Sequence, residues 1–413
     1  MKSQLQRRFR GLLVSAVTLL ALFPLLLIVL DSVPVGFSQT PSRLPRRHVQ
    51  TQGPPAPLIN DTEITARIKP ILDSSGVPSI IAALIGESGL NRIGVVGVRK
   101  KGSNVPVQLD DLWRIGGCTM AFTATLAGKL VERGQLRWDS TVAEVFPELA
   151  AGFHPAARAI TLRQLLTHYS GLKEALDWQH LRNSGDTVQQ QRLQAVRVGL
   201  GESPASTPGS QWLFSRLGYV IAGAMIERAE GLPWEQAVRT EIFVPLRMNS
   251  SGFGVTGTGE QVDQPWGHDE LGNPISPAAS GTDRPPVMGP SARIFCPLQD
   301  WARFVADLMN GGRGSKGLLL PETYHTLHTP FADVDAMGWS AHRLAKPGEY
   351  YLAFDGGDQG NYALVFAYPF TTRAIVICIN QGGDKSANTA HEVLAALAGL
   401  PLLEPPADPR PEQ

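Results

Sequence analysis

Hydrophobic and polar positions along this chain follow patterns that predict both strands and helices. Residues 79–98 form two apolar runs separated by glycine, as two buried strands joined by a turn would. Residues 120–131 carry apolar or small side chains on almost every helical face, which predicts a helix buried on all sides. Apolar runs at 362–368 and 374–379 predict two more strands, followed by a helix over 387–398. Strands at both ends with helices between them predict an α+β fold whose terminal strands share one antiparallel sheet.

The middle of the chain is mainly helical by the same criteria. Residues 160–166 predict a short helix with Thr161 as its N-cap. Residues 173–207 form a polar segment rich in Gln and Arg, which predicts a helical insertion or lid. Apolar residues recur at helical spacing in three further segments, 219–229, 234–243 and 301–309.

The N-terminal region combines basic residues with an uncharged apolar run. Four basic residues among the first ten precede residues 12–30, which would extend about 28 Å as a helix and cross a bilayer core. The small residues Gly36 and Ser38 also offer a cleavage site, so residues 1–38 are expected to be either a membrane anchor or a signal peptide. The basic flank predicts that the rest of the chain is extracytoplasmic, in the periplasm, at the cell surface or secreted.

Proline-rich segments delimit the folded part of the chain. Residues 39–62 are rich in Pro, Gln and Arg without apolar periodicity, which indicates an extended linker. Residues 403–413 form a Pro-rich tail that cannot sustain a helix or a central strand. The folded domain is therefore expected to span residues 63–402.

Composition excludes several classes of protein. Lys+Arg and Asp+Glu balance at 37 each, so binding to nucleic acid through bulk positive charge is not expected. The 3 cysteines are too few for a disulfide scaffold, and no CxxC pair is present for zinc. His325 and His328 lack a third ligand nearby in the sequence, so no metal and no cofactor are predicted.

Six sequence blocks, in order, carry a family resemblance. They are LWRIGGCTMAFTATLAGKLVERG from residue 112, LLTHYSGL at 165–172, PGSQWLFSRLGYVIAG at 208–223, IFVPLRMNSSGFG at 242–254, SARIFCPLQDWARF at 291–304 and FDGGDQGNYA at 354–363. Together they resemble the serine β-lactamase and penicillin-binding-protein superfamily, and specifically its class C-like branch of esterases and D-aminopeptidases. The resemblance covers about residues 66–400. It implies a β-lactamase/transpeptidase-like α+β fold, with an antiparallel sheet flanked by helices and a helical subdomain.

The chemistry of that superfamily requires three short motifs to meet. A serine opens a buried helix, and a lysine three residues later lies on the same helical face, where its amine takes the hydroxyl proton. Backbone N–H groups at the start of that helix help to stabilise the oxyanion. A Tyr-x-Asn motif supplies a second proton-handling group and an amide for the substrate, and a His-x-Gly or Lys-Thr-Gly strand forms the opposite wall.

All three motifs are degenerate in this sequence. The blocks place Gly117 at the serine position and Met120 at the lysine position. In the second motif Phe214 replaces the tyrosine and Arg216 the asparagine, and in the third Phe354 replaces the histidine. Glycine has no nucleophile and methionine has no titratable group. Loss of a nucleophile alone lowers the rate by on the order of 10⁶ in a well-studied triad enzyme. No catalytic residue of the inherited kind is therefore predicted.

Other polar residues near these motifs are candidates for ligand binding. Cys118 lies one residue beyond the serine position, but a shift of one residue rotates a helical side chain by about 100°. Its partner three residues later is Ala121, which accepts no proton, so a buried structural thiol is the alternative. The residues expected to line a binding cleft are Cys118, Ser215, Arg216, Asp355, Gly356 and Asp358. In this interpretation Arg216 faces the two aspartates across the cleft.

The resemblance and the degenerate motifs together predict a catalytically inactive protein of the cell envelope. Its cleft would bind a peptide-like or carboxylate-bearing small molecule, or an envelope protein, and the N-terminal segment would contact the membrane. One alternative is an active hydrolase of esterase, peptidase or β-lactamase type, with altered chemistry through Cys118 or groups in residues 173–207. Another is a purely structural partner in an envelope assembly.

Overall fold

The computed structural model describes residues 58–403 except 175, 316, 333–334, 345–348 and 359. The apolar run 12–30, most of the predicted linker and the tail from residue 404 lie outside the described residues. The helices are α3 (Thr62–Ser75), α4 (Thr119–Glu132), α5 (Val142–Val145), α6 (Leu162–Leu166), α7 (Trp178–Arg182), α8 (Val188–Gly201), α9 (Arg216–Glu230), α10 (Trp234–Val238), α11 (Gly289–Ala292), α12 (Leu298–Gly312), α13 (Pro321–His328) and α14 (Asp384–Ala398).

The strands form one large sheet and two small ones. They are β1 (Ser79–Gly86), β2 (Gly89–Gly97), β3 (Trp113–Arg114), β4 (Gly252–Phe253), β5 (Gly267–His268), β6 (Pro274–Ile275), β7 (Ile294–Cys296), β8 (Asp335–Ala336), β9 (Trp339–Arg343), β10 (Tyr350–Gly357), β11 (Tyr362–Tyr368) and β12 (Arg373–Ile379). The large sheet has the order β2-β1-β12-β11-β10-β9-β8, and each neighbouring pair is antiparallel. β1 pairs with β12 from Ile80↔Ile379 to Ile85↔Ala374, so the terminal strands share one sheet as predicted.

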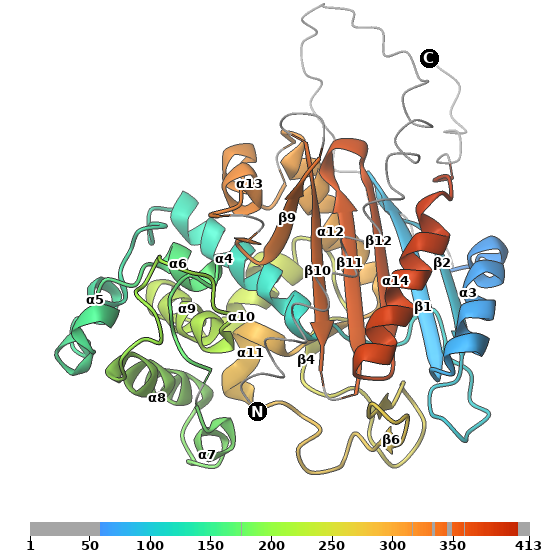
Figure 1. The fold of residues 1–413 in the computed structure, drawn as a ribbon, viewed down its shortest axis with the longest axis horizontal. Coiled ribbons are helices and arrows are strands. Elements are labelled where there is room, and N and C mark those ends of the chain that lie inside the picture. The colour runs from blue at the N-terminus through green and yellow to red at the C-terminus, as the bar shows by residue number, and fades with distance from the viewer. Residues whose placement is uncertain are drawn as a thin grey trace, which may run out of the picture. The chain divides into compact units, whose positions relative to one another are not determined.

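The sheet separates two hydrophobic cores. On one face α3 and α14 cover β1, β2, β11 and β12 and enclose a smaller core of residues such as Ile68, Leu364 and Leu397. On the other face α12 lies against β1 and β12, and the larger core extends from there into the helices α4 to α11 (Figure 1). The mixed architecture confirms the predicted α+β class with a helical region beside the sheet.

Local sequence explains why the helices near the motifs begin and end where they do. Thr161 caps α6 through a capping box with Gln164, as the sequence predicted. α4 buries every residue from Thr119 to Gly128, which confirms the helix without a polar face. The Gln- and Arg-rich segment contains α7 and α8, and Thr187 caps α8 through a second capping box.

No helix within residues 58–403 is long and apolar enough to cross a bilayer. The predicted anchor at residues 12–30 lies outside this range, so its role stays a prediction.

Candidate functional site

Glycines let strand β10 lie directly on the turn that precedes α4. This turn is the 3₁₀ helix η1 (Gly116–Cys118). A Cβ atom on Gly356 would lie 2.1 Å from the Ile115 carbonyl oxygen, and one on Gly116 would lie 2.7 Å from the Gly356 carbonyl oxygen. Neither distance is compatible with a side chain. The glycine retained in the third motif therefore has a packing role that is independent of catalysis.

The side chain of Phe354 closes the position at which the family carries its serine. A Cβ atom built on Gly117 would lie 3.1 Å from Phe354 Cε1 and 3.3 Å from the Asp355 carbonyl oxygen. The aromatic ring thus lies in tight contact with the point from which a serine side chain would extend. The structure brings the first and third motifs together, as the family resemblance implies, but their contact is apolar.

Met120 lies where the family carries its lysine, three residues after Gly117. Its side chain is fully buried within α4 and belongs to the larger core. A thioether in such a place packs well but exchanges no proton. The position of the general base is therefore part of the hydrophobic core.

Cys118 is also buried, with only 2% of its surface exposed. Its Sγ lies 3.7 Å from the Phe354 carbonyl oxygen. Burial, with a smaller contribution from the carboxylate of Asp355, raises the pKa of the thiol well above its ordinary value. Since the thiolate is the nucleophilic form, this cysteine is suited to packing and poorly suited to catalysis.

The second motif is built around the start of α9. Ser215 is the N-cap, and its side chain accepts a hydrogen bond from the Gly218 N–H at 3.1 Å. The Ser215 N–H donates to Nδ1 of His168 at 3.2 Å, and the rings of His168 and Phe214 lie 4.8 Å apart. Ser215 is fully buried, so its hydroxyl is committed to the helix end and does not face a ligand.

Arg216 does not face the two aspartates, which corrects the arrangement expected from the sequence. Its Nη1 lies 3.9 Å from Glu174 Oε1, and its backbone N–H donates to Glu174 Oε2 at 2.6 Å. The guanidinium group also lies 5.0 Å from the centre of the Phe214 ring. Glu174 is therefore the carboxylate that lies next to Arg216 at the start of α9, where the sequence analysis expected Asp355 and Asp358.

Asp358 instead holds the turn between β10 and β11. Its Oδ1 accepts hydrogen bonds from the backbone N–H groups of Gly360 and Asn361, each at 3.0 Å. Its Oδ2 lies 2.9 Å from Nη2 of Arg114, on β3. Oδ1 is therefore satisfied by the turn, whereas the buried Oδ2 is paired in charge with Arg114 but accepts no hydrogen bond from the described residues.

Asp355 lies on the opposite face of the sheet, which corrects its expected place in the cleft. Phe354 and Gly356 face η1, so the alternation of side chains along β10 directs Asp355 to the side of α14. There its Oδ2 accepts a hydrogen bond from the Tyr362 hydroxyl at 3.2 Å. The alternation of a strand, applied to residues 354–356, is the sequence signal that would have shown this.

Arg284 and Glu174 are the charged residues near the site that sequence reasoning missed. Arg284 precedes the two prolines of an irregular segment, and it lies within electrostatic range of Asp358, Arg216, Arg114 and Glu174. Its Nε is buried without a hydrogen-bond partner among the described residues. No motif or periodicity marks either residue, so the sequence offered no signal for them beyond their charge.

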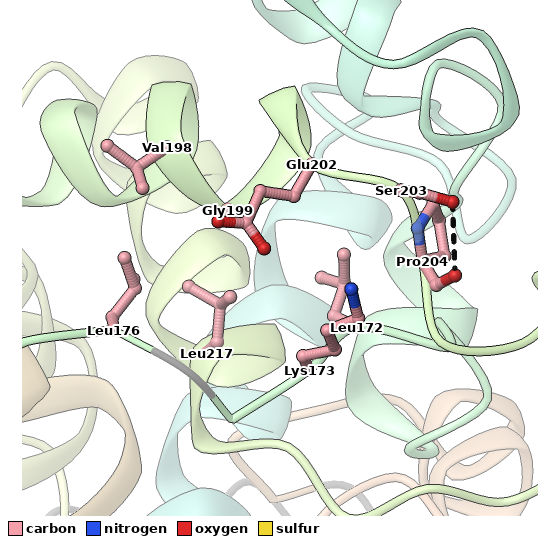
Figure 2. A pocket seen from close by; sticks show the side chains of 9 residues that line it. All are labelled: Leu172, Lys173, Leu176, Val198, Gly199, Glu202, Ser203, Pro204 and Leu217. Carbon is pink, nitrogen blue, oxygen red and sulfur yellow. Dashed lines mark hydrogen bonds between the residues drawn. The ribbon is translucent and has the colours of Figure 1, made fainter.

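The hollows described on the surface lie beside these positions and not on them. The hollow in Figure 2 measures about 290 Å³ including space open to solvent, and it is lined by Leu172, Leu176, Val198 and Leu217 together with Lys173 and Glu202. A second hollow of about 220 Å³ lies beside Arg114, Thr282 and Asn361. Neither is lined by Gly117, Phe214 or Phe354. Within the described residues there is also no group of three or more metal-ligating side chains.

The fold and the ordered motifs define the class to which this protein belongs. The family model described as Beta-lactamase matches residues 64–400, and the chain is a member of that family. This confirms the resemblance inferred from the six blocks and the serine-hydrolase fold that it implied.

Two relatives and two solved structures illustrate the membership. "Penicillin-binding protein 4" of Amycolatopsis lactamdurans is 28% identical over 354 residues, which cover 81% of this chain and 90% of that protein. "Beta-lactamase" of Escherichia coli K12 is 27% identical over 214 residues, covering 51% of this chain and 52% of that protein. The octameric penicillin-binding protein homologue from Pyrococcus abyssi has a TM-score of 0.65 at 21% identity, covering 82% of this chain and 77% of its own. The D-alanine carboxypeptidase AmpC from Burkholderia cenocepacia has a TM-score of 0.63 at 18% identity, covering 81% and 98%.

Proposed function

We propose that this protein is a catalytically inactive member of the Beta-lactamase family, and that the surface around its degenerate motifs binds a ligand or a partner. The observation that carries this proposal is the contact between Gly117 and Phe354. The nucleophile is missing, its place is covered by an aromatic ring, and the base position is a buried methionine. Degeneracy of all three motifs favours loss of the reaction over adaptation to a new substrate.

The ligand is proposed to be a peptide-like or carboxylate-bearing small molecule. Arg216 supports this because a guanidinium group, 30% exposed, stands where the family carries a neutral amide. The protein is further proposed to act in the cell envelope, extracytoplasmically. The support is the basic-flanked apolar run at residues 12–30, which suits either an anchor or an export signal.

An active hydrolase with altered chemistry is the first alternative. It would need Cys118 or a group in residues 173–207 as its nucleophile. The burial of Cys118 and the raised pKa of its thiol oppose the first route. A structural partner in an envelope assembly is the second alternative, and capture of a defined protein from solubilised membranes with no small-molecule binding would favour it.

Covalent labelling tests the proposal directly. The purified protein is incubated with a fluorescent penicillin, a chromogenic cephalosporin and a p-nitrophenyl ester, and adducts are mapped by mass spectrometry. We expect no adduct and no turnover. An adduct on any side chain would overturn the proposal, and turnover that disappears in Cys118→Ala would favour the hydrolase alternative.

Back-substitution provides the matched control. The double variant Gly117→Ser/Met120→Lys is expected to remain unlabelled because the Phe354 ring covers the new hydroxyl. Adding Phe354→His and Phe214→Tyr removes that ring and restores the family residues. Labelling of the quadruple variant alone would show that the assay detects a competent site on this scaffold.

A further inference from the structure

Four aromatic side chains form a continuous row across three strands of the large sheet. The ring of His342, on β9, stacks on that of Tyr351, on β10, with ring centres 4.7 Å apart and an interplanar angle of 13°. Tyr351 also stacks on Phe366 of β11, at 4.5 Å and 23°. Tyr368, further along β11, lies with its ring centre 5.1 Å from that of Phe366. These four residues are called the aromatic ladder below.

The aromatic ladder lies on the face of the sheet that α14 covers only in part. The strand neighbours Ala341, Leu352 and Val365 belong to the larger core, so alternation directs the ladder to the opposite face. The smaller core on that face includes residues of β11 up to Leu364 but no ladder residue. Figure 1 shows α14 in front of β12 and β11, whereas β9 and β10 have no described helix in front of them.

The rings of the aromatic ladder are only partly buried. His342, Phe366 and Tyr368 are each partly exposed, and only Tyr351, which lies between the other rings, falls to 9%. Stacked rings on a flat sheet present ridges and an apolar surface. Aromatic surfaces of this kind bind proline-rich segments in the polyproline II conformation, which loses little entropy on binding.

The sequence that follows the described domain has the composition that such a surface binds. The tail from residue 404 reads EPPADPRPEQ, in which Pro406 and Pro409 are three residues apart. A polyproline II helix has three residues per turn, so these two prolines would share one face. The tail carries three carboxylates and one guanidinium group. Arg373, opposite Tyr368 in the register of β11 and β12, places a positive charge beside the aromatic ladder.

The described chain ends at the level of the aromatic ladder. The Leu403 N–H donates to Oδ1 of Asn91 on β2, and the Leu403 carbonyl oxygen accepts from Nδ2 of Asn91, each at 2.8 Å. Arg92, the next residue of β2, is aligned across the sheet with Phe366. The alignment follows from the register pairs Arg92↔Leu84, Leu84↔Ile375 and Ile375↔Phe366.

The length of the tail is sufficient to reach the ladder from this point. Three strand spacings separate β2 from β11 and four separate it from β10, which is about 14 Å and about 19 Å at roughly 4.8 Å per spacing. At about 3.1 Å per residue, Pro409 can extend to about 19 Å from Leu403 and residue 413 to about 31 Å.

We propose that the tail from residue 404 docks in cis on the aromatic ladder, with Pro406 and Pro409 against the rings and its acidic residues near Arg373. A tethered segment needs only weak intrinsic affinity, because its effective concentration at the site is in the millimolar range. This surface is independent of the proposed function, since Phe354 and Gly356 of β10 face the opposite side of the sheet.

Titration with a synthetic peptide of sequence EPPADPRPEQ tests the docking. Calorimetry compares the full chain with a variant that ends at Leu403. We expect the shortened variant to bind the peptide at least about tenfold more tightly, because the tethered tail competes for the site in the full chain. A peptide with Pro406→Ser and Pro409→Ser is the control, and it should bind the shortened variant at least about tenfold more weakly.

Substitutions in the shortened variant assign the binding to the ladder. Phe366→Ser and Tyr368→Ser should each weaken peptide binding by about tenfold, because a ring contact is lost. Phe370→Ser is the matched control, since Phe370 is a 38% exposed aromatic residue in the turn between β11 and β12 and lies outside the ladder. It should bind the peptide like the shortened variant itself. Melting curves check that each variant is folded.

Several outcomes would overturn the docking. They are an absence of peptide binding to the shortened variant, equal binding to both chains, equal binding of the serine peptide, and full affinity in both ladder variants. A dimer in sedimentation of the full chain that disappears in the shortened variant would assign the tail to a second copy and would overturn docking in cis. None of these results bears on the proposed inactivity, which covalent labelling tests separately.

Discussion

Two arginines in this protein, Arg192 and Arg284, show opposite ways of burying a guanidinium group. Arg192, on α8, is fully buried, and all five of its N–H groups have acceptors: Glu227, Glu235 and the carbonyl oxygens of Pro286 and Val287. In Arg284 the buried Nε has no hydrogen-bond acceptor among the described residues. Both are charged, and both are removed from water to a large extent.

The difference lies in how completely each side chain is hydrogen-bonded. The Arg192 network joins α8 to α9 and α10, and it has no capacity left for a ligand because every donor is used. Around Arg284, in contrast, its Nε and the nearby Oδ2 of Asp358 are both buried without a hydrogen-bond partner among the described residues. Completeness of hydrogen bonding, and not burial or charge alone, is the property that distinguishes the two regions.

The largest effect should follow from breaking the complete network. Arg192→Met leaves Glu227 buried without its partner, and we expect the free energy of unfolding to fall by about 3–5 kcal/mol. Denaturant unfolding followed by circular dichroism measures this. Arg137→Met, at an exposed position, is the control and should change stability by no more than about 0.5 kcal/mol. A loss below about 1 kcal/mol in Arg192→Met would show that the network is not structural.

Lowering the pH should reduce the free energy of unfolding through His168, which lies near Arg216. Burial, and secondarily the charge of Arg216, lowers the pKa of His168 to about 3. Because this pKa lies below the ordinary value of 6.5, the unfolded chain takes up the proton first. Stability is then complete above pH 6.5 and declines as the pH falls toward 3, by about 1.4 kcal/mol per pH unit for this residue.

A substitution isolates that contribution. His168 has φ 62°, a conformation that asparagine tolerates, and asparagine also offers an acceptor near Nδ1. In His168→Asn the dependence of unfolding free energy on pH between 6 and 4.5 should be shallower by about 1.4 kcal/mol per unit. Parallel curves for the two proteins in urea titrations would contradict the assignment.

The smallest change in the free energy of unfolding is expected at Arg284, whose hydrogen bonding is incomplete. Arg284→Met removes a donor without an acceptor and a charge that lies near two arginines and two carboxylates, so stability should change by no more than about 1 kcal/mol in either direction. Arg114→Met is the matched comparison, because it leaves the 1% exposed Asp358 carboxylate without its partner and should be clearly destabilising. If Arg284→Met loses more than about 2 kcal/mol, Arg284 is a structural residue like Arg192.

The fold was largely predictable because its signals are local or carried by ordered motifs. The paired strands in 79–98, the buried helix after Gly117 and the cap at Thr161 all depend on neighbouring residues. The common sheet of the first and last strands followed from their positions at the two ends of the chain. These predictions were confirmed in the structure.

The details of the site were less accessible, because they depend on contacts between distant residues. The blocks identified Gly117 and Phe354 as motif positions. They did not reveal that the Phe354 ring lies against Gly117. Arg216 was assigned to the aspartates, whereas Glu174, in a loop without periodicity, lies next to it. No sequence pattern marks Arg284, because the feature that sets it apart is a buried Nε without an acceptor, which only the three-dimensional structure reveals.

The ring of Phe354 also restricts the order in which the family's motif residues could be introduced into this chain. A change of Gly117 to a residue with a side chain, made first, forces that side chain against the aromatic ring and gains no working hydroxyl. Replacement of the ring must come earlier, although by itself it only opens a void beside the core. Each single substitution toward the family residues is therefore expected to be unfavourable on its own, so that the packing around Phe354 favours retention of the present residues at both positions.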